Sequence, residues 1–294
     1  HQEELNGTGS ALQAVEPLEE EFFVVNGDVV VSERDLDNLR KKFHNSGSKV
    51  SMLAAGEEKP EKFGVLSITN DEVTAIHEKP EEPENALVNT GIYMFTPEIF
   101  DILNDLEDYQ NSLVDAVKEL AAKEEATFEL VEDYWVDIGD AKTLKKADAV
   151  KREFEITETE IADSAEVHEG VEIIGNAELA EETVLKPGTV IEGDVYIGEG
   201  TVVEPNTRLK NCSISLNGVI DAESVRESII FQENIVDPGV CIENCIIGEE
   251  SDIRSGSVIR ESFIGARSYI EINNSIYGVK FVPDARTDLS ELSK

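Results

Sequence analysis

The chain has 294 residues, and its 63 acidic and 25 basic side chains give a formal net charge of −38. Such a surface repels phosphate backbones and anionic lipid, so we expect neither a nucleic-acid nor a membrane partner. No apolar run approaches the ~20 residues of a membrane helix. The three cysteines have no metal-ligand spacing, which indicates reduced thiols in a cytoplasmic protein. Because the acids are spread along the whole chain, we expect adaptation to a salt-rich cytoplasm.

The chain opens with a glycine-rich turn that leads into a predicted helix. Gly7 and Gly9 let the backbone approach a flat or charged ligand closely, and Thr8 adds a hydroxyl. Leu12 stands where a G-x-G-x-x-G pattern needs its last glycine, and no strand precedes the turn. The stretch therefore fails as a dinucleotide-binding fingerprint, and taken alone it is most often a simple loop.

The residues from Phe22 to Val25 predict a short strand buried on both faces. Asn26 and Gly27 then end the strand, which places Asp28 just beyond its carboxyl end. Ligands bind at this edge of an open α/β sheet, and a carboxylate there can hold Mg²⁺. Asn-Gly-Asp is also common turn chemistry, so both interpretations stay open from this stretch alone.

Helices and strands alternate over the next hundred residues. Ser32 is the expected N-cap of one helix, and Thr96 caps another with Pro97 at its first position. Residues 65–68 and 73–76 flank Asn70-Asp71 and predict a hairpin. The other predicted elements are strands over 49–55, 88–95 and 134–139 and a helix whose apolar face carries Leu113, Val117 and Leu120.

Polar residues stand at the ends of several predicted strands. Glu78 and Lys79 offer an acceptor for hydroxyls and a cation for a phosphate, although the same residues also suit an exposed ion pair. Asp137 is a second carboxylate on an apolar strand. Its neighbour Trp135 is more often a core residue than a ligand platform. Asp140 is expected to cap the helix that starts near Ala141.

Five signatures follow one another in order: Gln2-x4-Gly7-Thr8, Asn26-Gly27-Asp28, Glu78-Lys79-Pro80, Asn89-Thr90-Gly91-Ile92-Tyr93 and Trp135-Val136-Asp137-Ile138-Gly139. Together they resemble the sugar-1-phosphate nucleotidyltransferases, or NDP-sugar pyrophosphorylases, over residues 1 to about 154. The resemblance implies a Rossmann-like α/β domain. It also implies an enzyme that joins a sugar 1-phosphate to a nucleoside triphosphate, here UTP or dTTP, and releases pyrophosphate.

The resemblance also implies a role for each motif. Asp28 and Asp137 would hold Mg²⁺ against the phosphates, and Lys79 would neutralise the sugar phosphate. The implied substrate-binding residues are Gln2, Gly7 and Thr8 for a pyrimidine base, Glu78, Asn89 and Gly91 for sugar hydroxyls, and Asn26, Gly27, Thr90 and Trp135 around them.

One departure from the family concerns its glycine-rich, arginine-containing triphosphate loop, which follows the first strand of the domain and has no counterpart here. The first residue is His1, which favours a fragment whose N-terminal part is missing, with natural loss of the loop as the alternative. Losing one well-placed donor can cost ~10²–10³ in rate. We therefore expect residues 1–294 alone to be inactive.

From Ile161 a six-residue period begins. Aliphatic side chains recur at Ile161, Val167, Ile173, Leu179, Leu185, Ile191, Ile197, Val203 and Leu209. A small or β-branched residue follows each by four positions, at Ala165, Val171, Ala177, Thr183, Thr189, Val195, Thr201, Thr207 and Ser213. The period blurs after Leu209 and returns from Ile247. This pattern predicts a parallel β-helix of hexapeptide repeats, which the family resemblance makes left-handed.

We therefore expect a partial nucleotidyltransferase domain over 1–154, a β-helix over 155–280 and a tail over 281–294. The β-helix favours stacking into a homo-oligomer, with a trimer preferred. Hexapeptide acyltransferases use a histidine as general base, and His168 is the one histidine after residue 77. Two alternatives therefore stay open: a bifunctional enzyme that also acetylates glucosamine 1-phosphate, and a non-catalytic regulatory relative.

Overall fold

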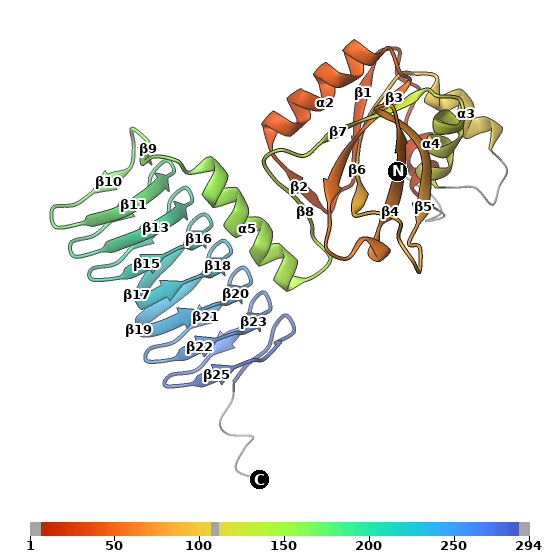
Figure 1. Ribbon diagram of the computed structural model, residues 1–294. Helices are drawn as coiled ribbons and strands as arrows, with labels where there is room; N and C mark the ends of the chain where they lie inside the picture. Colours follow the sequence, from red (N-terminus) through yellow and green to blue (C-terminus); the bar gives the residue numbers. More distant parts are fainter. Residues whose placement is uncertain (1–6, 107–111, 288–294) are drawn as a thin grey trace, which may run out of the picture. The chain divides into compact units, whose positions relative to one another are not determined.

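The computed structural model of the chain describes residues 7–106 and 112–287. They belong to two compact units, His1–Ile138 and Gly139–Lys294, whose helices and strands are labelled in Figure 1. Helix α5 (Ala141–Glu155) belongs to the second unit, whereas the sequence pattern put the domain boundary near residue 154. Among the described helices, none combines the length and apolarity that crossing a membrane requires.

The first unit is an α/β structure around a six-stranded sheet in the order β1-β6-β3-β7-β5-β4. The sheet is mixed, because β3 runs parallel to β7 and antiparallel to β6. A separate two-stranded sheet joins β2 to β8. The elements are α1 (Thr8–Gln13), β1 (Phe22–Val25), β2 (Val29–Val31), α2 (Glu33–Ser46), β3 (Val50–Gly56), the 3-10 helix η1 (Pro60–Lys62), β4 (Gly64–Thr69), β5 (Glu72–Glu78), β6 (Leu87–Phe95), α3 (Ile99–Asp105), α4 (Leu113–Ala122), β7 (Ala126–Leu130) and β8 (Trp135–Asp137).

Helices cover both faces of the large sheet, as side-chain alternation along β3 shows. Met52 packs into one apolar cluster with α1, α3 and α4, while Leu53 packs into a second cluster with Leu39 and Phe43 of α2. Figure 1 shows α2 apart from α3 and α4, with the sheet between them. Trp135 of β8 joins the α2 cluster, so the two-stranded sheet lies on that face.

The strand predicted to be buried on both faces is partly buried on one face and exposed on the other. β1 lies at an edge of the sheet and pairs with β6 alone among the described strands. Phe22 stacks on Phe100, with ring centroids 5.6 Å apart, whereas Phe23 and Val25 on the other face are 39% and 43% exposed. An apolar run predicts a strand, but it does not reveal what covers each face.

The local predictions are mostly confirmed. Ser32 caps α2 by accepting a hydrogen bond from the Asp35 backbone N–H, and Asp140 caps α5 in a capping box with Thr143. The predicted hairpin is β4–β5, turned by Asn70 and Asp71 at positive φ. The helix start at Thr96 was wrong, because Thr96 to Glu98 form a turn and α3 begins at Ile99.

The second unit is a parallel β-helix with α5 packed on one of its faces. Strands β9 to β25 pair in parallel, each on the coil before it. They are β9 (Glu160–Ile161), β10 (Glu166–Val167), β11 (Glu172–Leu179), β12 (Val184–Leu185), β13 (Val190–Ile197), β14 (Val202–Val203), β15 (Arg208–Lys210), β16 (Ser213–Ile214), β17 (Val219–Arg226), β18 (Ile229–Ile230), β19 (Ile235–Glu243), β20 (Ile246–Ile247), β21 (Asp252–Ile253), β22 (Val258–Arg260), β23 (Phe263–Ile264), β24 (Tyr269–Ile270) and β25 (Ser275–Tyr277).

The predicted aliphatic positions form the interior of this β-helix. Ile191 is fully buried and pairs with Leu209 of the next coil, eighteen residues later. The first coil is open at its end, so Ile161 and Val167 remain 47% and 40% exposed. The hexapeptide pattern therefore predicts correctly which side chains point into the β-helix. Complete burial of such a side chain also needs a neighbouring coil on both sides.

The period blurs after Leu209 because the coils become shorter while the core continues. Ile197 pairs with Ile214, seventeen residues later, and Leu209 pairs with Val225, sixteen residues later. One corner prediction is wrong for this reason. Cys212 takes the buried corner position, and Ser213 faces outward, where its hydroxyl donates to Asp148 of α5.

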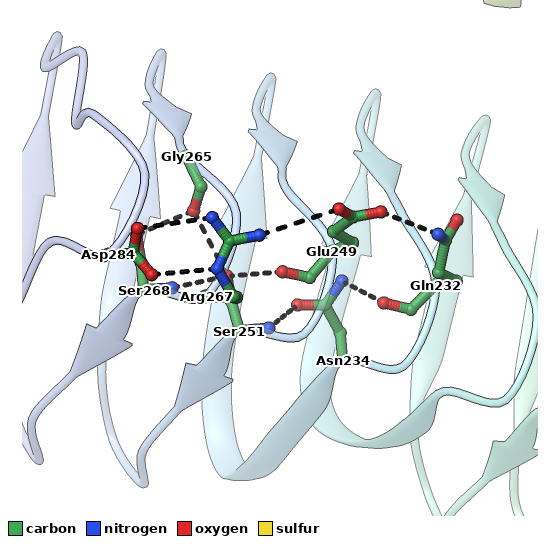
Figure 2. Close-up of polar contacts among 8 residues, drawn as sticks. All are labelled: Gln232, Asn234, Glu249, Ser251, Gly265, Arg267, Ser268 and Asp284. Atoms are coloured by element: carbon green, nitrogen blue, oxygen red, sulfur yellow. Dashed lines mark hydrogen bonds and ion pairs between the residues drawn. The ribbon is translucent and has the colours of Figure 1, made fainter.

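Polar ladders stabilise the corners, and Figure 2 shows one of them. The Ser251 backbone N–H donates to the Asn234 side-chain oxygen at 3.0 Å, and the Ser268 N–H donates to the Ser251 hydroxyl at 3.0 Å. These side chains satisfy backbone groups that the turns leave unpaired. Outside them, Arg267 pairs with Asp284 at 2.9 Å.

Candidate active site

The two carboxylates that the sequence singled out are neighbours in the first unit. β2 and β8 pair antiparallel, with Val29 opposite Asp137. The next rung is a hydrogen bond of 2.7 Å from the Ile138 N–H to the carbonyl oxygen of Asp28. Asp28 and Asp137 are therefore held side by side by backbone pairing, although they are far apart in sequence.

The electrostatics of the pair favour a cation. Partial burial raises the pKa of Asp137, the negative charge of Asp28 raises it further, and Lys79 opposes both effects. Two adjacent carboxylates leave further coordination positions for phosphate oxygens, which is how Mg²⁺ is commonly bound. Within the described residues no group of three or more His, Cys, Asp or Glu side chains could hold a metal. Asp28 and Asp137 are thus a two-carboxylate donor set that could hold Mg²⁺ only together with oxygen ligands from another molecule.

Lys79 follows the last residue of β5, and its charge lowers the pKa of Asp137. Its backbone N–H donates to the Phe63 carbonyl at 3.0 Å, and its φ is +43°. A left-handed backbone at a residue with a Cβ costs roughly 1–2 kcal/mol. This strained turn holds a cation close enough to Asp137 to affect its pKa.

Asn26 and Gly91 join two motifs that sequence reasoning treated separately. The Asn26 N–H donates to the Gly91 carbonyl at 3.1 Å. Gly91 has a φ of +78°, and a Cβ added there would lie 2.2 Å from Asn26 Nδ2. Only glycine therefore leaves space for the Asn26 side chain next to the start of the Asp28 turn.

Asn89, Tyr93 and Glu78 form a second polar group. Asn89 Nδ2 donates to the Tyr93 hydroxyl at 2.6 Å, and its Oδ1 accepts from the Gly91 N–H at 3.2 Å. Burial raises the pKa of Tyr93 to about 12, with Asn89 lowering it and Glu78 raising it. The phenol is thus a neutral group that fixes Asn89, and Glu78 lies near enough to affect it.

Thr90 and Trp135 are both buried and hydrogen-bonded within the protein. The Thr90 hydroxyl donates to the Leu53 carbonyl at 2.9 Å, and the Trp135 indole N–H donates to the Thr90 carbonyl at 3.2 Å. Trp135 also meets Phe63 edge to face, with ring centroids 5.6 Å apart. These contacts connect the strand of Asp137 to the strand of Asn89 and Gly91.

The glycine-threonine turn lies at the start of α1. Gly7 precedes the helix with a φ of +132°, and the Thr8 hydroxyl accepts a hydrogen bond of 3.0 Å from the Leu113 N–H of α4. Gln2 lies outside the described residues. Gly27 has no heavy atom within 4 Å of where a Cβ would lie, so the turn before Asp28 is open on that side.

Sequence reasoning missed the role of Asp35, which lies in the first turn of α2. Asp35 is fully buried, and its carboxylate accepts from the backbone N–H groups of Glu132, Asp133 and Tyr134 at 2.7, 3.2 and 3.3 Å. The Ser32 hydroxyl donates to it as well, at 2.7 Å. Asp35 thereby fixes the segment that leads into β8 and Asp137. The three backbone donors are about a hundred residues away, so no local signal could reveal them.

Comparison with known proteins identifies the class to which this domain belongs. The model of the nucleotidyl transferase family matches residues 1–153, just over half of the chain, so the chain is a member of that family.

The chain is also similar to individual known proteins over part of its length. The bifunctional protein GlmU of Methanocaldococcus jannaschii is 34% identical over 143 residues, which are 47% of this chain and 33% of the relative. The UTP–glucose-1-phosphate uridylyltransferase AglF of Haloferax volcanii is 35% identical over 104 residues, covering 34% of this chain and 42% of the relative. A solved structure from Bacillus anthracis, assigned as a glucose-1-phosphate thymidylyltransferase, aligns with a TM-score of 0.48 and 26% identity over 52% of this chain and 64% of that chain. The chain thus spans between about a third and two fifths of the length of these two curated relatives.

Proposed function

We propose that this protein transfers a nucleotidyl group from a nucleoside triphosphate, UTP or dTTP, to a sugar 1-phosphate and releases pyrophosphate. The observation that carries the proposal is the pairing of β2 with β8, which sets Asp28 beside Asp137 and within electrostatic reach of Lys79. Family membership and the uridylyltransferase relative support the same chemistry.

The reaction needs little acid–base chemistry. A phosphate oxygen of the sugar 1-phosphate attacks the α-phosphorus, and the bond from that phosphorus to the oxygen bridging to the β-phosphate breaks. Lys79 would neutralise the sugar phosphate, and Glu78, Asn89 and Gly91 would bind the sugar hydroxyls. Mg²⁺, bound by Asp28 and Asp137, would supply charge neutralisation for the phosphates. Asn26 and Gly27 would position the turn that carries Asp28.

Pyrophosphate release from UTP or dTTP with glucose 1-phosphate tests the proposal, and residues 1–294 are compared with any longer product that the gene encodes. Asp28→Asn and Asp137→Asn should each abolish release, whereas Asp71→Asn in the exposed β4–β5 turn should leave it unchanged. Mn²⁺ binding to the chain, followed by electron paramagnetic resonance, gives a readout that needs no turnover. If no nucleotide and sugar phosphate give release, the non-catalytic alternative replaces the proposal.

Acetyl transfer is the second candidate, favoured by the parallel β-helix and by a relative named as bifunctional. His168 would be its base, and its side chain is 45% exposed and 3.9 Å from Glu166. Consumption of acetyl-CoA with glucosamine 1-phosphate, compared between the parent protein and His168→Ala, tests this activity separately from pyrophosphate release.

We also propose that the protein forms a homo-oligomer, with a trimer favoured, through one face of the β-helix. Outward side chains of four successive coils, Val184, Val202, Val219 and Ile235, form an apolar row there. Val219 and Ile235 are 40% and 44% exposed, which is unusual on so acidic a surface. Light scattering should give a multiple of the chain mass, and Val219→Glu should reduce it to one chain.

A cytoplasmic, salt-rich setting is part of the same proposal. It is supported by the net charge of −38, since salt screens repulsion between like charges. The thermal midpoint should rise between dilute buffer and molar KCl, and an unchanged midpoint would contradict it.

A further inference from the structure

A cavity of about 560 Å³ lies in the second unit, between the first turns of α5 and the β-helix face that carries β20 and β23. Three lysines line it, Lys142, Lys145 and Lys280, with Glu261 the one carboxylate among the lining residues. In the whole chain acidic residues outnumber basic ones by 63 to 25. The lining of this cavity therefore carries a net positive charge, whereas the protein as a whole is strongly negative.

None of the three ammonium groups forms an ion pair with a carboxylate of the described residues, whereas Lys151 on the same helix pairs with Glu155. Lys145 donates to the backbone carbonyl of Asn244 at 3.0 Å and to its side-chain oxygen. Lys280 lies over the ring of Phe263, 5.9 Å from its centroid. These contacts place two of the lysines at the cavity without neutralising them.

Lys142 stands in the first turn of α5, which contains no acidic residue. A cation at this end of a helix is unfavourable, because the backbone N–H groups there already carry partial positive charge. The carboxylate of Asp140 is committed to capping, since it accepts from the backbone N–H groups of Lys142 and Thr143 at 2.9 and 2.8 Å. An anion in the cavity would compensate the repulsion between the Lys142 cation and the partial positive charge at the start of α5.

We propose that the cavity binds a phosphate monoester of a small polar metabolite. The phosphate would lie among the ammonium groups of Lys142, Lys145 and Lys280, since lysine acts on phosphate as a mobile point charge. Ile246, Phe263 and Val279 supply an apolar wall for the carbon skeleton, which free phosphate would leave uncovered. The site consists entirely of residues of the second unit and does not depend on the proposed nucleotidyl transfer.

Titration of the full chain with glucose 6-phosphate, followed by ³¹P NMR in EDTA at the salt concentration that keeps the chain folded, tests the site. Lys142→Gln and Lys280→Gln should each weaken binding about tenfold, the usual loss for a hydrogen bond to a charged group. Lys146→Gln removes the same charge from the same helix outside the cavity, and it should change binding by less than about twofold. Circular dichroism of each variant confirms folding.

Four results would overturn the proposal. The first is the absence of saturable binding of glucose 6-phosphate to the parent chain. Equal weakening by Lys142→Gln and Lys146→Gln would indicate diffuse attraction by net charge. Equal affinity for inorganic phosphate and glucose 6-phosphate would exclude an ester site. Loss of binding in Lys79→Gln would place the ligand at the candidate active site.

Discussion

Replacing Gly91 by alanine tests the contact that joins the Asn89–Gly91 segment to the Asp28 turn. Gly91 has a φ of +78°, and holding a residue with a Cβ there costs roughly 1–2 kcal/mol. The new Cβ would also lie 2.2 Å from Nδ2 and 2.7 Å from Cγ of Asn26, so the Asn26 side chain must move. Such overpacking typically costs about 1–3 kcal/mol. We therefore expect Gly91→Ala to lower the unfolding free energy of the first unit by about 2–5 kcal/mol.

Urea unfolding followed by tryptophan fluorescence measures this loss. Trp135 is the one tryptophan of the sequence, and its indole N–H donates to the carbonyl of Thr90, next to Gly91. Gly27→Ala is the matched control, because a Cβ at Gly27 meets no atom within 4 Å, and we expect a change of less than about 1 kcal/mol. Because Asn26 leads into Asp28, Mn²⁺ binding should weaken in Gly91→Ala only. Equal unfolding midpoints for the two variants would refute the reasoning.

Three further predictions concern the β-helix core, the Asp137 carboxylate and the buried Asp35. Ile191→Asp should disrupt the β-helix by several kcal/mol, since it buries an unpaired carboxylate. The outward Glu192→Lys, which loses only an exposed ion pair with Lys210, should cost about 1 kcal/mol or less in the same circular dichroism melt. The raised pKa of Asp137 means that the folded state holds this proton more tightly than the unfolded chain, so the group favours folding at low pH and destabilises the fold as pH rises through its folded pKa. Asp137→Asn should therefore raise the metal-free melting temperature at pH 7 while abolishing Mn²⁺ binding. Asp35→Ala should cost about 3 kcal/mol in Trp135-monitored unfolding, because it leaves one buried and two partly buried N–H donors without their carboxylate acceptor.

Signals that act within a few residues made most of the fold predictable. The N-cap residues Ser32 and Asp140 predict the starts of α2 and α5, and Asn70-Asp71 predicts the β4–β5 turn. The β-helix was predictable because aliphatic residues recur every six positions. One inward residue such as Ile191 therefore predicts that the residue six positions later also points inward. The proposed site residues came from ordered motifs rather than from the chemistry of any single residue.

The features that could not be predicted depend on contacts between distant segments. Phe23 is exposed because β1 lies at the edge of the sheet. The sequence of β1 does not indicate which strands lie beside it. The wrong corner at Ser213 follows from shortened coils, which shift the inward position to Cys212. The clash that restricts position 91 to glycine requires the fold to bring Asn26 beside it.

The sheet that carries the candidate site is small, so contacts from outside it must hold the site in place. β2 and β8 have three residues each and form a sheet of their own, and an isolated two-stranded sheet is marginally stable at best. Asp28 and Asp137 repel each other on this pair, so its geometry must be stabilised from outside. Asp35 holds the chain before β8, and the indole of Trp135 holds β8 against Thr90. The buried carboxylate of Asp35 and the buried indole of Trp135 thus position the candidate site. Substituting either residue can alter the spacing between Asp28 and Asp137 without changing these two carboxylates themselves.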